Sequence, residues 1–374
     1  MTVMTSLAGE QNPFVRYRER LDAYAGVEAG DLTDAEFVDL VERLNERVVE
    51  VAGVGFAVTP VIDGAELASA LGLDVELTIK SEVDNVAGSH KARHLFGVAL
   101  HLLIAALRGE QLPERLAIAS CGNAALGAAT VARALDIAVD VFVPTWADQV
   151  TVDALGELGA RLTQCERREG EVGDPCYHRF REAVDDGARS FSVQGTDTPT
   201  TFDGGRTLGW EIAEQAPTCD ALYVQVGGGA LATSVAMALP GRRVYPVQAE
   251  GCAPLARAWK RLSPDFDFVA AAEAPDEYMT PWIDPSSFAT GILDDVTYDW
   301  LALLRQTHAS GAVPLVASEQ AIHGAFTTAR DVTGLNVCST GTAGLAGLIE
   351  HTETLHTASG REHAVVIFSG VHRT

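Results

Sequence analysis

Segments with strand periodicity alternate with segments of helix periodicity along most of the chain, and this alternation limits the fold more than any other feature. Residues 75–80 alternate apolar and polar side chains as a half-buried strand does, whereas residues 123–135 form an alanine-rich helical pattern. Strands that alternate with helices predict an α/β protein with mainly parallel sheets. A chain of 374 residues is also long enough for two domains.

The same periodicities predict the individual elements. Thr33 and Glu36 have the spacing of a capping box before the first long helix. Residues 263–288 are rich in Asp, Pro and aromatic residues and are expected to form an extended surface loop. The expected strands are residues 75–80, 116–119, 139–143, 161–164, 191–194, 221–226, 243–249 and 364–368, and the expected helices are residues 34–50, 91–107, 123–135, 150–158, 176–183, 206–216, 231–239, 318–332 and 342–351.

Composition excludes several classes of partner and site. A formal net charge of −24 argues against nucleic acid and anionic membranes, which bind basic patches. The sequence contains no stretch of 18 uninterrupted apolar residues, no basic leader segment and no C-x-x-C pair among its six cysteines. We therefore expect a cytoplasmic protein with reduced thiols, without a membrane span and without a metal site.

Lys91 is the first candidate for chemistry, and it is one of only three lysines, with Lys80 and Lys260. It ends the run Gly88-Ser89-His90-Lys91 at the start of an expected helix, among small and hydroxyl-bearing residues. A lysine amine condenses with an aldehyde only when it is unprotonated, and burial and a helix N-terminus both favour that form. Lys91 is therefore either a Schiff-base lysine or an ordinary lysine at a helix start.

Three further segments follow expected strands and carry groups that bind anions or polar rings. The turn of residues 120–123 suits a carboxylate, or its Ser and Asn are simple helix caps. The three glycines of residues 227–229 suit a phosphate, although a single glycine also serves a tight turn. Ser369 follows the last strand, where ligands of open sheets bind, or it is a plain serine at a strand end. The sequence contains neither G-x-G-x-x-G nor G-x-x-x-x-G-K-[ST], so a dinucleotide or nucleoside-triphosphate site is poorly supported.

An amine, a phosphate cradle, a carboxylate cradle and a partner for a ring nitrogen together match pyridoxal 5′-phosphate (PLP) with an amino-acid substrate. From about residue 55 onward the chain resembles the fold-type II PLP enzymes, which include tryptophan synthase β, cysteine synthase, threonine synthase and threonine dehydratase. The resemblance implies PLP as cofactor and a homodimer with two α/β domains, each a twisted, mainly parallel sheet flanked by helices. The implied division is a helical N-terminal extension, residues 1–54, a large PLP-binding domain, residues 55–92 and 189–374, and a small domain, residues 93–188.

The resemblance also gives each candidate residue a role. Lys91 forms the Schiff base and then acts as the base, and His90 lies near the phosphate. The groups that hold PLP are Gly227, Gly228, Gly229 and Ala230 at the phosphate, Asn123 at the ring oxygen O3′ and Ser369 at the ring nitrogen. The residues on the substrate side are Ser89, Arg93, Ser120, Cys121, Gly122 and Asn123, and Arg93 is alternatively an ion-paired structural residue.

The implied reaction is elimination or replacement at Cβ or Cγ of a small amino acid. Residues 119–144 and 247–254 look most like threonine synthase, whereas the run Lys91-Ala92-Arg93 is closer to dehydratases. The leading expectation is thus a PLP-dependent lyase similar to threonine synthase. The alternatives are a serine or threonine ammonia-lyase, a cysteine synthase-like β-replacement, and a non-enzymatic protein that binds a phosphorylated metabolite. An uncharged Ser369 opposite the ring nitrogen favours elimination or replacement over transamination.

Overall fold

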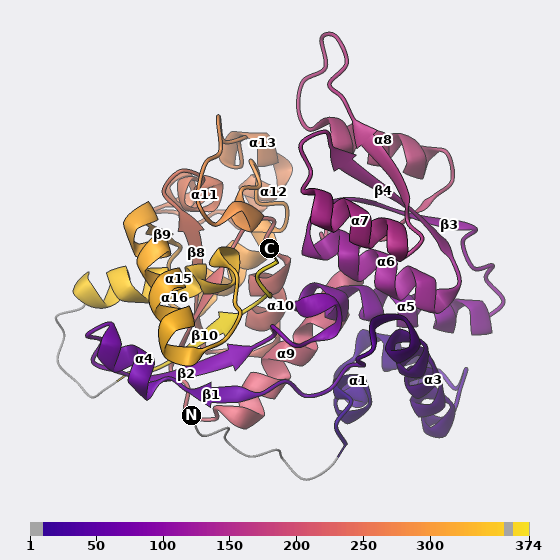
Figure 1. The fold of residues 1–374 in the computed structure, drawn as a ribbon, viewed down its shortest axis with the longest axis horizontal. Coiled ribbons are helices and arrows are strands. Elements are labelled where there is room, and N and C mark those ends of the chain that lie inside the picture. Colours follow the sequence, from indigo (N-terminus) through magenta and orange to yellow (C-terminus); the bar gives the residue numbers. More distant parts are fainter. Residues whose placement is uncertain (1–9, 355–361, 374) are drawn as a thin grey trace. The chain divides into compact units, whose positions relative to one another are not determined.

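The computed structural model describes residues 10–354 and 362–373, which fold as two compact units (Figure 1). Unit 1 comprises residues 59–83, 208–354 and 362–372, and unit 2 comprises residues 10–58, residues 84–207 and Arg373. Each unit has its own sheet flanked by helices, which confirms the predicted α/β class. Within the described ranges, no helix combines the length and the apolar character that a bilayer crossing requires.

Unit 1 is built on a six-stranded sheet in the order β1-β2-β10-β7-β8-β9. Strand β1 pairs antiparallel with β2, and the other pairs are parallel. The strands are β1 (Val61–Asp63), β2 (Val75–Ser81), β7 (Ala221–Gln225), β8 (Arg243–Ala249), β9 (Leu315–Ala317) and β10 (Glu362–Phe368). The helices are α4 (Ala65–Ala70), α10 (Ala230–Ala238), α11 (Pro254–Leu262), α12 (Phe268–Glu273), α13 (Pro275–Tyr278), η4 (Thr290–Ile292), α14 (Trp300–Ala309), α15 (Glu319–Thr333) and α16 (Ser339–Thr354).

The central strands of this sheet are mostly apolar because helices cover both of its faces. Leu222 and Val224 pack into one hydrophobic cluster with side chains of α10 and α14. Tyr223, which lies between them, packs into a second cluster with side chains of α15 and α16. Successive side chains of β7 therefore point to opposite faces of the sheet, as in any β-strand. Strands β7 and β10 are parallel neighbours, so the segments that follow them lie at the same edge of the sheet.

Unit 2 is built on four parallel strands in the order β5-β4-β3-β6. The strands are β3 (Arg115–Ala119), β4 (Ala138–Pro144), β5 (Arg161–Cys165) and β6 (Arg189–Ser190). The helices are α1 (Pro13–Arg16), η1 (Arg18–Arg20), η2 (Asp22–Tyr24), α2 (Ala25–Glu28), α3 (Asp34–Ala52), η3 (Val86–Gly88), α5 (Lys91–Leu107), α6 (Asn123–Leu135), α7 (Gln149–Glu157) and α8 (Pro175–Asp185). Helix α9 (Thr201–Gln215) gives its residues up to Thr207 to unit 2 and the others to unit 1. The predicted capping box before α3 is confirmed, since Thr33 Oγ1 accepts from Glu36 N and Thr33 N donates to Glu36 Oε2.

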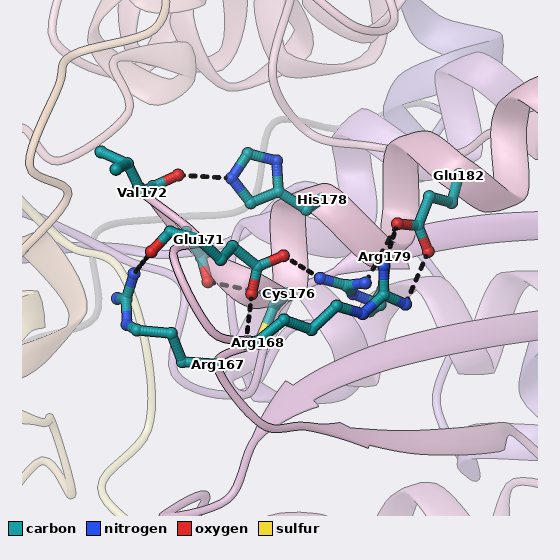
Figure 2. A network of polar contacts seen from close by, with 9 residues as sticks. Arg167, Arg168, Glu171, Val172, Cys176, His178, Arg179 and Glu182 are labelled. Carbon is teal, nitrogen blue, oxygen red and sulfur yellow. Dashed lines mark hydrogen bonds and ion pairs between the residues drawn. The ribbon is translucent and has the colours of Figure 1, made fainter.

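An ion-pair network fixes the connection between β5 and α8 (Figure 2). Arg168 donates to both oxygens of Glu182, at 2.7 and 3.2 Å. Arg179 bridges Glu182, at 3.0 Å, and Glu171. His178 Nε2 lies 2.7 Å from the carbonyl oxygen of Val172, further along the same connection. The side chains of this network therefore link the nine-residue connection, residues 166–174, to α8.

Helices α5 and α9 cross at two glycines that allow their backbones to touch. A Cβ atom on Gly204 would lie 2.0 Å from the carbonyl oxygen of Arg93, and one on Gly97 would lie 2.5 Å from Gly204 N. Both values are far below van der Waals contact. The crossing therefore requires glycine at these positions, and it holds α5 in a fixed place within unit 2.

Several expected elements differ from the observed ones. Helix α9 begins at Thr201 rather than at residue 206. Gly204 and Gly205 lower helix propensity, but Gly204 is the residue at which α9 crosses α5. The expected surface loop of residues 263–288 contains two short helices, α12 and α13, so the prediction of one extended loop was wrong. Residues 191–194 are not a strand, since β6 ends at Ser190, and β1 and β9 were too short for the periodicity to predict.

Candidate active site

Lys91 is the first residue of α5 and follows a strained turn in unit 2. Ala87 and Gly88 both have left-handed φ angles, of 53° and 64°, which only glycine adopts without cost. Ser89 is buried, and its Oγ accepts from Lys91 N at 3.4 Å. The side chain of Lys91 is half-buried beside the N-terminal end of a 17-residue helix. The positive end of the helix dipole disfavours an ammonium group at this position.

Two buried histidines flank the first turn of α5. The rings of His90 and His94 lie edge to face, with their centroids 5.5 Å apart. Burial is the main cause that lowers the pKa of His94 to about 3 and that of His90 well below its usual value, and the nearby Lys91 charge lowers both further. Both imidazoles are therefore neutral at physiological pH. Within the described residues, His90 Nδ1 has no hydrogen-bond partner, and His94 Nδ1 lies 3.0 Å from Thr201 O.

The asparagine turn lies at the start of α6, next to the start of α5. Asn123 is the first residue of α6, and the preceding Gly122 N donates to Ser120 Oγ at 3.4 Å. Cys121 in the same turn is half-buried and forms no disulfide. A Cβ atom on Gly127 would lie only 3.2 Å from Ala92 N, so the first turns of the two helices pack side by side. Lys91 and Asn123 are thus brought to neighbouring helix N-termini, where unpaired backbone N–H groups favour an anion.

Two arginines near these helix starts have different surroundings. Arg93 is 1% exposed, and its Nη1 donates to Thr207 Oγ1 at 3.1 Å, close to the crossing of α5 and α9. Arg373, which sequence reasoning did not single out, donates to Asn123 Oδ1 and, at 2.6 Å, to Ala87 O. Because a guanidinium only donates, the amide oxygen of Asn123 faces Arg373 and its NH2 group points elsewhere.

The glycine loop of unit 1 joins β7 to α10. Gly229 is the N-cap of α10 with φ 105°, a conformation that L side chains rarely adopt. A Cβ atom on Gly227 would lie 2.3 Å from Asp294 Oδ2 and 3.0 Å from Ile292 Cα, so the loop has no room for a side chain there. The predicted residues Gly227, Gly228, Gly229 and Ala230 therefore form one tight turn into a helix N-terminus, which is the backbone arrangement that binds phosphate.

Ser369 follows β10 and is held by a residue that the sequence analysis did not assign to the site. Gln225, the last residue of β7, donates through Nε2 to Ser369 Oγ at 2.5 Å and to Ile367 O at 3.1 Å. Both side chains are 4% exposed. The only signal for Gln225 in the sequence is a polar residue at the end of an otherwise apolar strand.

These groups fit PLP in three respects. The loop of residues 227–229 consists of glycine alone, with no room for a Cβ atom at Gly227, and the positive end of α10 suits a phosphate. His90 Nδ1 is a buried polar atom that has no partner within the described residues, as expected where a polar ligand binds nearby. The Ser369 hydroxyl and the Asn123 amide are uncharged donors for ring atoms. Asp294 is the exception, because its carboxylate beside Gly227 repels an anion.

Comparison with known proteins places these features in a family. The sequence pattern of the family described as "Pyridoxal-phosphate dependent enzyme" matches residues 54–370. The chain is 30% identical over 242 residues to the biosynthetic L-threonine dehydratase of Pasteurella multocida, an alignment that covers 63% of this chain and 44% of that enzyme. It is 30% identical over 234 residues to the phenylserine dehydratase of Ralstonia pickettii, covering 62% of this chain and 68% of that enzyme. The chain thus spans less than half the length of the Pasteurella relative.

Solved structures agree on the fold. The structure of maize serine racemase matches with a TM-score of 0.69 and 19% identity, covering 89% of this chain and 94% of that one. Threonine deaminase isoform 2 from Solanum lycopersicum matches with a TM-score of 0.68 and 21% identity, covering 92% and 86%. At these identities the likeness concerns the fold alone, and it confirms the predicted fold type. With the family pattern matching more than three hundred residues, including Lys91, the glycine loop and Ser369, the chain belongs to the family of pyridoxal-phosphate dependent enzymes.

Proposed function

We propose that this protein is a PLP-dependent ammonia-lyase that acts on a small β-hydroxy amino acid of the serine or threonine type. The observation that carries the proposal is the uncharged partner at the end of β10, where Ser369 is buried against the equally uncharged Gln225. A carboxylate there would favour a protonated ring and the long-lived carbanions of transamination. A neutral partner instead favours prompt loss of a leaving group. The dehydratases among the relatives support this choice over a threonine synthase-like reaction.

In this proposal each predicted residue keeps a defined task. Bound PLP supplies an aldehyde that condenses with amines and a ring that withdraws electrons from the substrate Cα. Lys91 would provide the amine that holds the cofactor and would later take the proton from the substrate Cα, and the positive end of α5 disfavours the ammonium form of that amine. His90 lies on the phosphate side. The phosphate ligands are Gly227, Gly228, Gly229 and Ala230.

The remaining residues orient the ring and the substrate. Asn123 donates to the ring oxygen O3′, and Ser369 faces the ring nitrogen. The substrate carboxylate is held by Ser89, Ser120, Cys121 and Gly122 together with Asn123. For Arg93 we favour a structural task, because its guanidinium is buried and bonded to Thr207 rather than exposed to a substrate.

A substrate panel tests the reaction. The purified protein, loaded with PLP, is incubated with L-threonine, L-serine, O-phosphohomoserine and O-acetylserine, and 2-oxoacid, phosphate and acetate are measured. We expect 2-oxoacid and ammonia from threonine or serine, and nearly complete loss of turnover in Lys91→Ala. Phosphate release from O-phosphohomoserine would instead identify a threonine synthase-like enzyme, and acetate release a β-replacement enzyme. A protein that takes up no PLP would support the binding-protein alternative.

We also propose that the chain is a cytoplasmic homodimer. The family resemblance supports the dimer, and the six cysteines, which form no disulfide, support a reducing compartment. Light scattering after size exclusion tests the first statement, and cell fractionation tests the second.

A further inference from the structure

Gln225 is a buried polar residue at the end of an otherwise apolar strand. It is the last residue of β7 and is 4% exposed, yet its Oε1 has no hydrogen-bond partner within the described residues. Helix α16 lies close over it, because a Cβ atom on Gly344 would be 2.9 Å from this oxygen. An unpaired buried carbonyl oxygen costs stability, so the amide is retained for what its NH2 group bonds. The amide therefore has a task other than packing.

The orientation of the Gln225 amide follows from its neighbours. Nε2 lies 3.1 Å from Ile367 O and 3.4 Å from Gly341 O, and both of these backbone oxygens only accept hydrogen bonds. Rotating the amide by half a turn would place Oε1 against these two carbonyl oxygens, which repel it. The NH2 group must therefore face them. The same NH2 group lies 2.5 Å from Ser369 Oγ, so Gln225 donates and Ser369 accepts.

This direction of donation decides what Ser369 can offer to a ligand. A serine hydroxyl has one proton and accepts through its lone pairs. Because the Gln225 amide already supplies a proton to Oγ, Ser369 keeps its own proton for a partner that accepts. An unprotonated pyridine nitrogen is such a partner, whereas a protonated pyridine nitrogen is itself a donor and would meet a second donor.

We propose that Gln225 is a positioning residue that turns the Ser369 hydroxyl into a hydrogen-bond donor toward the ring nitrogen of PLP and so keeps that nitrogen unprotonated. The proposal rests on the proposed function, because it assigns Ser369 to the ring nitrogen. Gln225 would thereby also influence which reaction occurs. An unprotonated ring withdraws electrons only weakly from the substrate Cα, which favours elimination over racemisation of the same substrate.

The protonation state of the ring nitrogen tests the proposal directly. Wild type and variants are loaded with PLP that carries ¹⁵N in the ring, and the ¹⁵N chemical shift is followed as a function of pH. In Gln225→Leu, and in the slimmer Gln225→Met as a safeguard against misfolding, the proton affinity of the ring nitrogen should rise about tenfold, which equals one pH unit. The fraction of substrate that is racemised rather than eliminated should rise together with this proton affinity.

Gln248→Leu is the matched control. Gln248 is a second buried glutamine, on the neighbouring strand β8, and its amide bonds Thr297 Oγ1 and Leu255 N. Its replacement should lower stability and leave the ring titration unchanged. Ser369→Ala should shift the titration as Gln225→Leu does, and combining the two changes should add nothing.

Two outcomes would overturn the role of Gln225. In the first, Gln225→Leu and Gln225→Met titrate as wild type does. In the second, Gln225→Leu shifts the titration by the same amount when Ser369 is already alanine, which would show that it acts independently of the hydroxyl. A wild-type protein that takes up no PLP would instead contradict the proposed function itself.

Discussion

His90 and His94 show how single residues set the charge around Lys91. Both imidazoles are buried within the first turns of α5, and burial lowers the pKa of each. A neutral imidazole carries no net charge, so neither histidine adds a positive charge beside Lys91. The same residues link the chemistry of the site to the stability of the fold, because a buried neutral histidine resists protonation.

His94 makes stability dependent on pH in a defined window. Its folded-state pKa of about 3 lies below the unfolded-state value near 6.5, so between these values the unfolded chain binds a proton that the folded chain does not. The contribution of neutral His94 to the free energy of unfolding is complete above about pH 6.5. It is lost at about 1.4 kcal/mol per pH unit as the pH falls toward 3. Urea unfolding of wild type and His94→Gln at pH 6, 5 and 4 checks this, since the difference between them should shrink by that amount per unit. A difference that does not change with pH would contradict it.

Candidate residues whose chemistry is local could be proposed from the sequence, whereas candidates that depend on remote neighbours could not. Lys91, the glycine loop and Ser369 each carry a reactive or conformational property in their own short segment. Gln225 matters only because Ile367 and Ser369, more than 140 positions further along, meet it at the end of β10. Arg373 likewise meets Asn123 across 250 positions.

At the scale of elements, the crossing of α5 and α9 is what fixes the helix that carries Lys91. Gly204 lies against the carbonyl oxygen of Arg93, a backbone atom that cannot move aside as a flexible side chain can. Gly156 in α7 offers a contrast, because a Cβ atom there would meet nothing within 4 Å. In the same unit, Gly204 therefore leaves no space for a side chain, whereas Gly156 does.

Alanine at these two positions should change stability in opposite directions. Gly204→Ala forces α5 and α9 apart and should lower the free energy of unfolding by about 2–3 kcal/mol. Gly156→Ala removes conformational freedom from the unfolded chain and should raise it by about 0.5–1 kcal/mol. Urea unfolding curves of both variants provide the measurement. Equal stability of the two variants would refute the crossing as the constraint on α5.

Long periodic elements were the most predictable part of the fold. Helix α5 and strand β8 have the bounds that their patterns predict, because both are long and strongly apolar. The start of α9 was missed because two adjacent glycines are typical of a loop, and the sequence does not show that α5 packs on Gly204. Strands β1 and β9 have three residues each, too few to show any period.

At the scale of the whole molecule, the chain consists of two units, and each of them carries some of the predicted site residues. Unit 2 supplies Lys91 and Asn123 at the starts of two adjacent helices. Unit 1 supplies the glycine loop and Ser369 at the ends of two adjacent strands. The family pattern spans both units, from residue 54 to residue 370. The assignment of Lys91 to the cofactor is therefore the central claim of the account.

Reduction with borohydride followed by peptide mass spectrometry tests that claim most directly. The chain has only three lysines, and Lys80 is fully buried with its Nζ 2.6 Å from Glu211 Oε2, which leaves Lys260 as a built-in comparison. We predict that PLP-loaded protein is yellow, that borohydride bleaches it, and that the reduced cofactor is found on Lys91 alone. A label on Lys260 or Lys80, or no label on any lysine, would contradict the account.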